Sequence, residues 1–123
     1  MYNKIEKWLN EVLTQLIPNG VTAFSFNLYE DALNRWSMEI IGTSSFDPDD
    51  SDWACDEVCD FGTRNNPLSW KQEDTTWEQI LDEVVQALTK YLEEGEYANV
   101  LKSYNGVGVG FVDGDLEILY AQV

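Results

Sequence analysis

Residues 46–61, FDPDDSDWACDEVCDF, contain the side chains whose types and spacing come closest to a chemical site in this sequence. The stretch contains seven carboxylates, two cysteines and one tryptophan, and it contains no basic residue. Side chains of these types serve as metal ligands, as redox thiols, or as a surface that binds a positively charged partner. Each of these three chemistries makes its own demand on the spacing.

The spacing does not fit a metal site. If Asp47 is the first position of a calcium-binding loop, Asp52 stands where glycine is required and Val58 where a bidentate glutamate is required. The chain contains no histidine, and two thiols alone do not complete a structural zinc site. We therefore expect no metal site and no cofactor, and calcium binding that is no better than weak.

The cysteines do not form a redox motif. Cys55 and Cys59 are separated by three residues, whereas a CxxC motif has two. On a strand their α-carbons would lie roughly 13 Å apart, beyond the reach of a disulfide. On a helix they would be neighbours. We interpret them as buried free thiols.

No catalytic set stands out in the sequence. Without histidine the usual general base at neutral pH is missing, and no serine or cysteine has an activating partner. Gly106, Gly108 and Gly110 alternate, whereas a dinucleotide-binding fingerprint places its third glycine one residue later and opens a helix. We interpret these glycines as strand positions on which a helix or loop packs closely. We predict that the protein is not an enzyme.

Two amphipathic helices are predicted to support the acidic stretch. The first spans residues 2–17 and ends before Pro18. The second begins at Thr75 or Thr76, each of which has a capping-box partner three residues on (Glu78 and Gln79), and it ends at Gly95. The apolar stripes consist of Ile5, Trp8, Leu9, Val12, Leu13, Leu16 and Ile17 in the first helix, and of Trp77, Ile80, Leu81, Val84, Leu88, Tyr91 and Leu92 in the second.

Alternation of apolar and polar residues predicts the first strands. Residues 21–29 and 35–42 form an antiparallel hairpin around a polar turn. Residues 52–61 are predicted to form a third strand, with Trp53, Cys55, Cys59 and Phe61 on one face; a short helix that starts near Ser51 fits the same residues. Residues 68–72 are a candidate fourth strand.

The last strands are predicted as a second hairpin, preceded by a connection at residues 97–105. Asp113 and Gly114 both tolerate the positive φ of a type I′ turn. A two-residue turn there pairs Phe111 with Leu116, Val109 with Ile118, and Val107 with Tyr120, all on one face. The order α-β-β-β-(β)-α-β-β predicts a single α+β domain over residues 1–123. Its sheet of five to six strands is mainly antiparallel and is packed by two helices.

The charge of the chain limits its partners. The net charge is −16, from 23 acidic and seven basic residues, so nucleic acid and anionic membranes are repelled. Charges interrupt every apolar run near the start, unlike a signal peptide, and no run approaches the roughly 18 apolar residues of a membrane span. We expect a cytoplasmic protein of undetermined oligomeric state that binds neither nucleic acid nor membrane.

A basic protein is the partner class that fits the acidic stretch. Carboxylates at this density repel one another, and a cationic partner relieves that repulsion on binding. Trp53 fits either an interface anchor within the acids or a core position beside Cys55. The predicted partner-binding residues are Asp49, Asp50, Asp52, Trp53, Asp56, Glu57 and Asp60.

Small size, strong acidity, the lack of a catalytic set and the charged start together resemble the immunity proteins of bacterial polymorphic toxin systems, including contact-dependent growth inhibition. The resemblance is one of general character over the whole chain and assigns no individual residue. It implies an antitoxin that binds a cognate toxin, often a basic nuclease, and blocks its nucleic-acid site with carboxylates. The element order and acidity also resemble type III secretion chaperones, acidic dimers whose order adds a final helix. A structural or regulatory domain whose acidity maintains solubility is a third interpretation.

Overall fold

Two long strands with alternating apolar residues form the centre of the sheet. In the computed structural model, which describes residues 1–122, β1 (Ala23–Ala32) and β2 (Arg35–Thr43) pair antiparallel. The other strands are β3 (Glu57–Cys59), β4 (Leu68–Lys71), β5 (Gly106–Phe111) and β6 (Glu117–Ala121). Their order is β3-β2-β1-β5-β6, and β4 also pairs with β2. The predicted α+β class and element order are confirmed, and the parallel pairing of β1 with β5 makes the sheet mixed.

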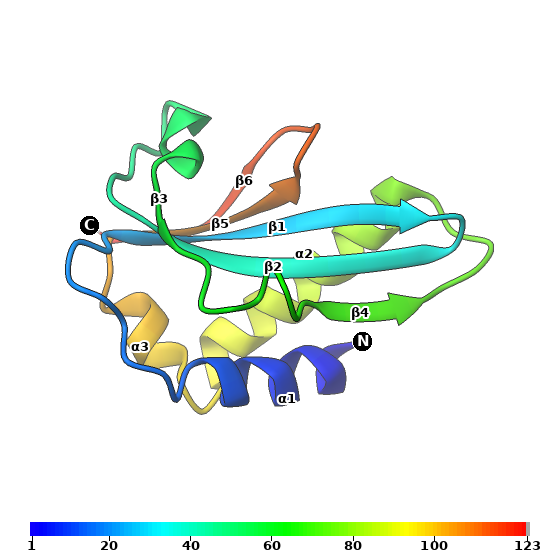
Figure 1. The fold of residues 1–123 in the computed structure, drawn as a ribbon, viewed down its shortest axis with the longest axis horizontal. Helices are drawn as coiled ribbons and strands as arrows, with labels where there is room; N and C mark the ends of the chain where they lie inside the picture. The colour runs from blue at the N-terminus through cyan, green and yellow to red at the C-terminus, as the bar shows by residue number, and fades with distance from the viewer. Residues whose placement is uncertain (123) are drawn as a thin grey trace.

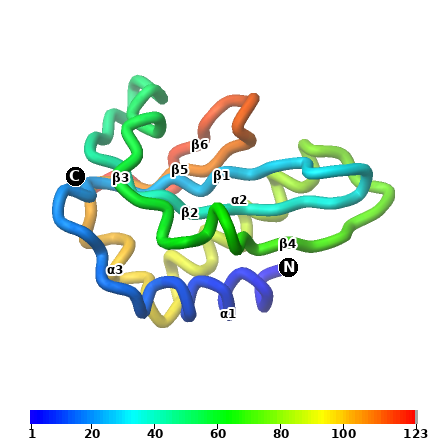
Figure 2. Tube along the Cα trace, viewed as in Figure 1, coloured from blue at the N-terminus to red at the C-terminus, as the bar shows by residue number. Residues whose placement is uncertain are grey.

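The sheet has one face covered by helices and one face covered by loops. Figure 1 shows α1 (Tyr2–Val12), α2 (Trp77–Glu94) and α3 (Ala98–Lys102) below the sheet. Above it lies the short 3-10 helix η1 (Ser51–Cys55), beside the β5–β6 edge of the sheet although the two are far apart in sequence (Figures 1 and 2). The acidic stretch therefore lies on the face opposite the helices. No helix within residues 1–122 is long and apolar enough to cross a membrane.

The core lies between the sheet and the helices. Phe24, Phe26 and Leu28 of β1 are fully or almost fully buried there, together with apolar residues of α1, α2, β2 and β5. Tyr91 joins the three helices, because its hydroxyl donates to Asn10 Oδ1 at 2.7 Å and accepts from a backbone N–H beside α3. The predicted capping box of the second helix is confirmed: Thr76 and Gln79 satisfy each other's backbone N–H groups.

The first helix ends five residues earlier than predicted. α1 ends at Val12, and Leu16, assigned to its apolar stripe, is 94% exposed. The hydroxyl of Thr14 donates to Glu11 O at 2.7 Å and occupies a carbonyl that the next helical turn requires. The Gln15 side chain then donates to Phe61 O on a distant loop. These contacts favour a turn over continued helix.

The predicted strand at residues 52–61 is wrong in its first half. Residues 51–55 form η1, as in the short-helix alternative, and only Glu57–Cys59 pair with β2. The side chain of Asp50 accepts a hydrogen bond from Asp52 N and so caps a helical turn where the alternating pattern predicted extended chain. Because the turn rotates the chain, Trp53 is buried whereas Cys55 is exposed.

The second hairpin differs from its predicted register by one residue. Val107 pairs with Tyr120 as predicted, but Val109 lies opposite Glu117 instead of Ile118, because the pairing shifts between Val107 and Gly108. Neither Asp113 nor Gly114 has a positive φ, so the turn is not type I′. Residues 97–105, predicted only as the connection between helix and hairpin, contain α3.

Candidate partner-binding surface

The acidic stretch is fixed to the sheet by two aromatic side chains. Phe46 and Trp53 pack edge to face, with ring centroids 4.9 Å apart, over the open face of β5. A Cβ atom at Gly106 would overlap the Phe46 ring, and one at Gly108 would lie 3.0 Å from the Trp53 ring. The interpretation of these two glycines as sites of close loop packing is therefore confirmed. The glycines allow two bulky rings to rest on the strand.

Several carboxylates hold the loop in shape. Asp47 accepts a hydrogen bond from Asp49 N at 2.9 Å, and Asp50 accepts one from Asp52 N at 3.0 Å. The Ser45 hydroxyl donates to Asp56 at 2.6 Å. Short polar side chains that bond to nearby backbone stabilise turns. These contacts give the acidic segment a defined conformation.

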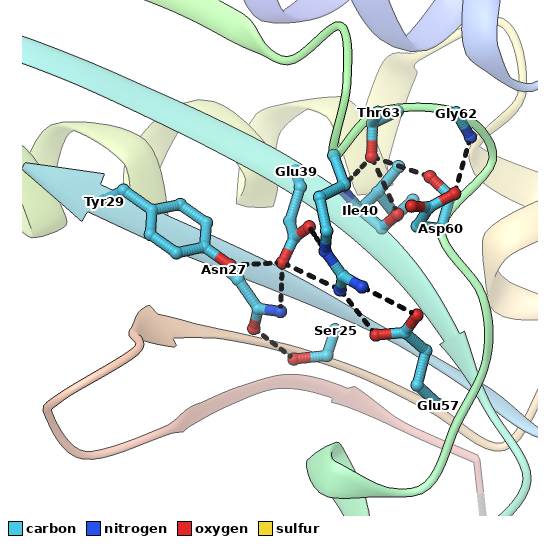
Figure 3. Close-up of polar contacts among 10 residues, drawn as sticks. Ser25, Asn27, Tyr29, Glu39, Ile40, Glu57, Asp60, Gly62 and Thr63 are labelled. Carbon is cyan, nitrogen blue, oxygen red and sulfur yellow. Dashed lines mark hydrogen bonds and ion pairs between the residues drawn. The ribbon is translucent and has the colours of Figure 1, made fainter. Parts of the chain in front are cut away.

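A threonine side chain bonds to β2 in the gap between β3 and β4, which pair with different parts of the same edge. Ile40 N, in the gap between the two short strands on the edge of β2, donates to Thr63 Oγ1 at 3.0 Å. The same hydroxyl lies 3.0 Å from Ile40 O and 2.8 Å from Asp60 O. Asp60 accepts from Gly62 N at 2.9 Å and closes the turn. Figure 3 shows these contacts. The residue that follows Thr63 is Arg64, whose side chain reaches Glu39 on β2.

Arg64 connects the acidic stretch to a buried carboxylate. Its Nε donates to Glu39 Oε1 at 3.0 Å, and its two terminal nitrogens donate to Glu57. Glu39 is 1% exposed and also accepts hydrogen bonds from Asn27 at 2.9 Å and Tyr29 at 2.6 Å. Figure 3 shows Asn27, Tyr29 and Glu57 gathered around Glu39. The sequence alone does not reveal this network, because its members come from β1, β2, β3 and a loop.

The network keeps Glu39 ionised. Burial alone would raise the pKa of Glu39, but the hydrogen bonds from Tyr29, Asn27 and Arg64 outweigh it and hold that pKa below its ordinary value. Burial and the bond to Glu39 raise the pKa of Tyr29 to about 12. Hydrogen bonds to Glu57 and Glu39 raise the pKa of Arg64. The ionised Glu39 and Arg64 therefore form an ion pair beneath one end of the acidic stretch.

The predicted partner-binding residues fall into three groups. Asp49, Asp50, Asp52 and Asp56 are exposed, and the side chains of Asp49 and Asp52 accept no hydrogen bond from the described residues. Glu57 is exposed but paired with Arg64, and Asp60 is half-buried at its turn. Trp53 is 3% exposed, so in the free chain it is a buried anchor.

The thiols are free, as predicted, but they are not both buried. Cys55 is exposed, and Cys59 is half-buried. Burial raises the pKa of the Cys59 thiol. Among residues 1–122 no three His, Cys, Asp or Glu side chains are grouped so that they could hold a metal ion.

The chain was compared with protein-family models, with curated proteins and with solved structures. No family, protein or structure among them matches it.

Proposed function

We propose that this protein is an immunity protein, an antitoxin that binds and neutralises a basic, nuclease-type toxin through its acidic surface. The observation that carries the proposal is that exposed carboxylates project from a segment that is fixed to the sheet. Asp49 and Asp52 project from a segment whose rings are seated on β5 and whose far end is held by Arg64. A surface that is already ordered spends little conformational entropy on binding.

Charge supports the same partner class. With a net charge of −16, the chain attracts basic proteins over a distance, and clustered charge raises association rates above the neutral range of about 10⁵–10⁶ M⁻¹s⁻¹. A basic nuclease has the cationic surface that such a cluster complements, because it binds phosphates with lysine and arginine. Carboxylates that occupy this surface would exclude the nucleic acid.

The double substitution Asp49→Asn and Asp52→Asn tests the proposal. Neither side chain holds the loop, so the melting temperature is expected to stay within a few degrees of the parent. The toxin proposed here is sought as the product of a neighbouring gene and used in an inactive form. Its binding is expected to weaken at least roughly tenfold at low salt, with a smaller salt dependence. Calorimetry at two salt concentrations measures both effects.

The matched control is Glu93→Gln with Glu96→Gln. It also removes two negative charges, but from exposed positions at the helical side of the molecule, and it is expected to change affinity for the toxin little. Equal affinity of the Asp49/Asp52 variant and the parent at both salt concentrations would contradict the proposal. A neighbouring gene product that does not bind the parent would contradict it as well.

A further inference from the structure

A half-exposed tryptophan at the start of α2 is held by a stack of rings. Trp77 was predicted to belong to the apolar stripe of the helix, but it is 52% exposed. Its ring packs edge to face on Phe111 at 6.0 Å, and Phe111 packs in the same way on the buried Trp36 at 6.0 Å. Trp77 is therefore a fixed aromatic platform at the surface.

Two hollows adjoin at this platform, and together they are called the groove below. One, of about 420 Å³, lies between α2 and β6 and is lined by Leu81 and Val85. The other, of about 390 Å³, lies between β1 and the β5–β6 turn and includes Val112, which is 51% exposed. Trp77, Phe111 and Gly114 line both hollows, so the two adjoin at these residues.

The rim of the groove is acidic. Among the described residues that line it none is basic, and six are carboxylates: Glu30, Glu78, Asp82, Asp113, Asp115 and Glu117. Asp82 accepts a hydrogen bond from Gln86, whereas the other five accept none from side chains of the described residues. A purely apolar partner would remove water from these carboxylates without providing hydrogen bonds or charges in its place, which costs free energy.

We infer that this groove binds a cationic polypeptide segment in which arginine or lysine alternates with aliphatic residues. A guanidinium or ammonium group over Trp77 gains a cation–π contact and pairs with the rim carboxylates, while the aliphatic side chains fill the two hollows. A second copy of this chain is a poor occupant, because it would bring another −16 charges to the same rim. The groove is distinct from the acidic stretch, and its test does not use the toxin.

A synthetic peptide of three Arg-Leu repeats is the probe, added to the full chain labelled with ¹⁵N and followed by NMR. The Trp77 indole signal and the Phe111 amide signal are expected to shift on addition of the peptide. A peptide with glutamine for each arginine is expected to bind at least roughly tenfold more weakly, because the contacts to the ring and rim are lost. High salt is expected to weaken the Arg-Leu peptide more than the glutamine peptide.

Variants locate the peptide. Trp77→Ala is expected to lower affinity for the Arg-Leu peptide about tenfold, and Glu78→Gln with Glu117→Gln tests the rim without altering the ring stack. Asp49→Asn with Asp52→Asn removes the same two charges from the acidic stretch and is expected to leave peptide affinity within about twofold. Unchanged affinity in both groove variants, shifts confined to residues 47–60, or no binding at millimolar peptide would each overturn the inference.

Discussion

Replacement of Trp53 by alanine is expected to lower the free energy of unfolding by about 2–4 kcal/mol. The indole is 3% exposed and packs between Phe46 and the backbone of Gly108, so its removal leaves a cavity that a strand cannot fill. Its Nε1 is buried with no hydrogen-bond partner among the described residues, and loss of that group offsets part of the cost. Urea unfolding measures the change.

Trp53→Phe is the matched control. Phenylalanine keeps a ring over Gly108 and removes the unpaired N–H, so its free energy of unfolding is expected to stay within about 1.5 kcal/mol of the parent. Hydrogen exchange of residues 46–56 separates global from local loosening, and the alanine variant is expected to exchange faster there. An alanine variant as stable as the phenylalanine variant would show that the ring does not anchor the acidic stretch.

Arg64→Met is the second substitution with a large expected effect, about 2–3 kcal/mol of lost stability at neutral pH. The methionine keeps much of the length of the side chain but leaves Glu39, which is 1% exposed, without its cationic partner. The expected loss of stability is small for a broken buried ion pair, because Arg64 is half exposed and water reaches its side of the contact. Asn27 and Tyr29 remain as donors.

The pH dependence identifies Glu39 as the source of this loss. In the parent the pKa of Glu39 lies below its ordinary value of 4.5, so its contribution is present above pH 4.5 and is lost as the pH falls through the lowered pKa. In the Arg64→Met variant the pKa of Glu39 loses the lowering effect of Arg64 and is expected to lie above that of the parent. The stability difference between variant and parent is therefore expected to shrink as the pH is lowered.

A double variant completes this test. Glu39→Gln in the Arg64→Met background removes the unpaired buried charge and is expected to recover part of the lost stability. A difference between Arg64→Met and the parent that does not change between pH 7 and pH 4, with no recovery in the double variant, would contradict the role assigned to the network.

The fold was predictable from the sequence wherever local pattern and tertiary packing agree. Phe24, Phe26 and Leu28 alternate because one face of β1 is buried under helices, and the Thr76 capping box marks the start of α2 because both of its hydrogen bonds are local. Prediction failed where hydrogen bonds that the apolar pattern does not show decide the conformation. The chain leaves α1 before Leu16, where the Thr14 hydroxyl donates to Glu11 O and the Gln15 side chain donates to Phe61 O, 46 residues away.

The candidate site was predictable only in part for the same reason. The density of carboxylates at residues 47–60 is visible in the sequence, and so is the ambiguity of Trp53. The burial of Trp53 depends on Gly108, and the pairing of Glu57 depends on Arg64 and Glu39, which is buried on another strand. The Trp77 groove requires Phe111 to lie beside the start of α2, and no local pattern encodes that contact.

The central claim is tested most directly by the rate of association between the unmodified protein and an inactive form of the proposed toxin partner. This rate is measured by stopped-flow fluorescence over a range of salt concentrations. If an anchored acidic surface captures a basic protein, the association rate constant falls by at least roughly tenfold as ionic strength rises from about 0.01 M to 1 M, where the Debye length shrinks from about 30 Å to 3 Å. The dissociation rate constant is expected to change much less. An association rate constant that is the same at both ends of this range would contradict the claim.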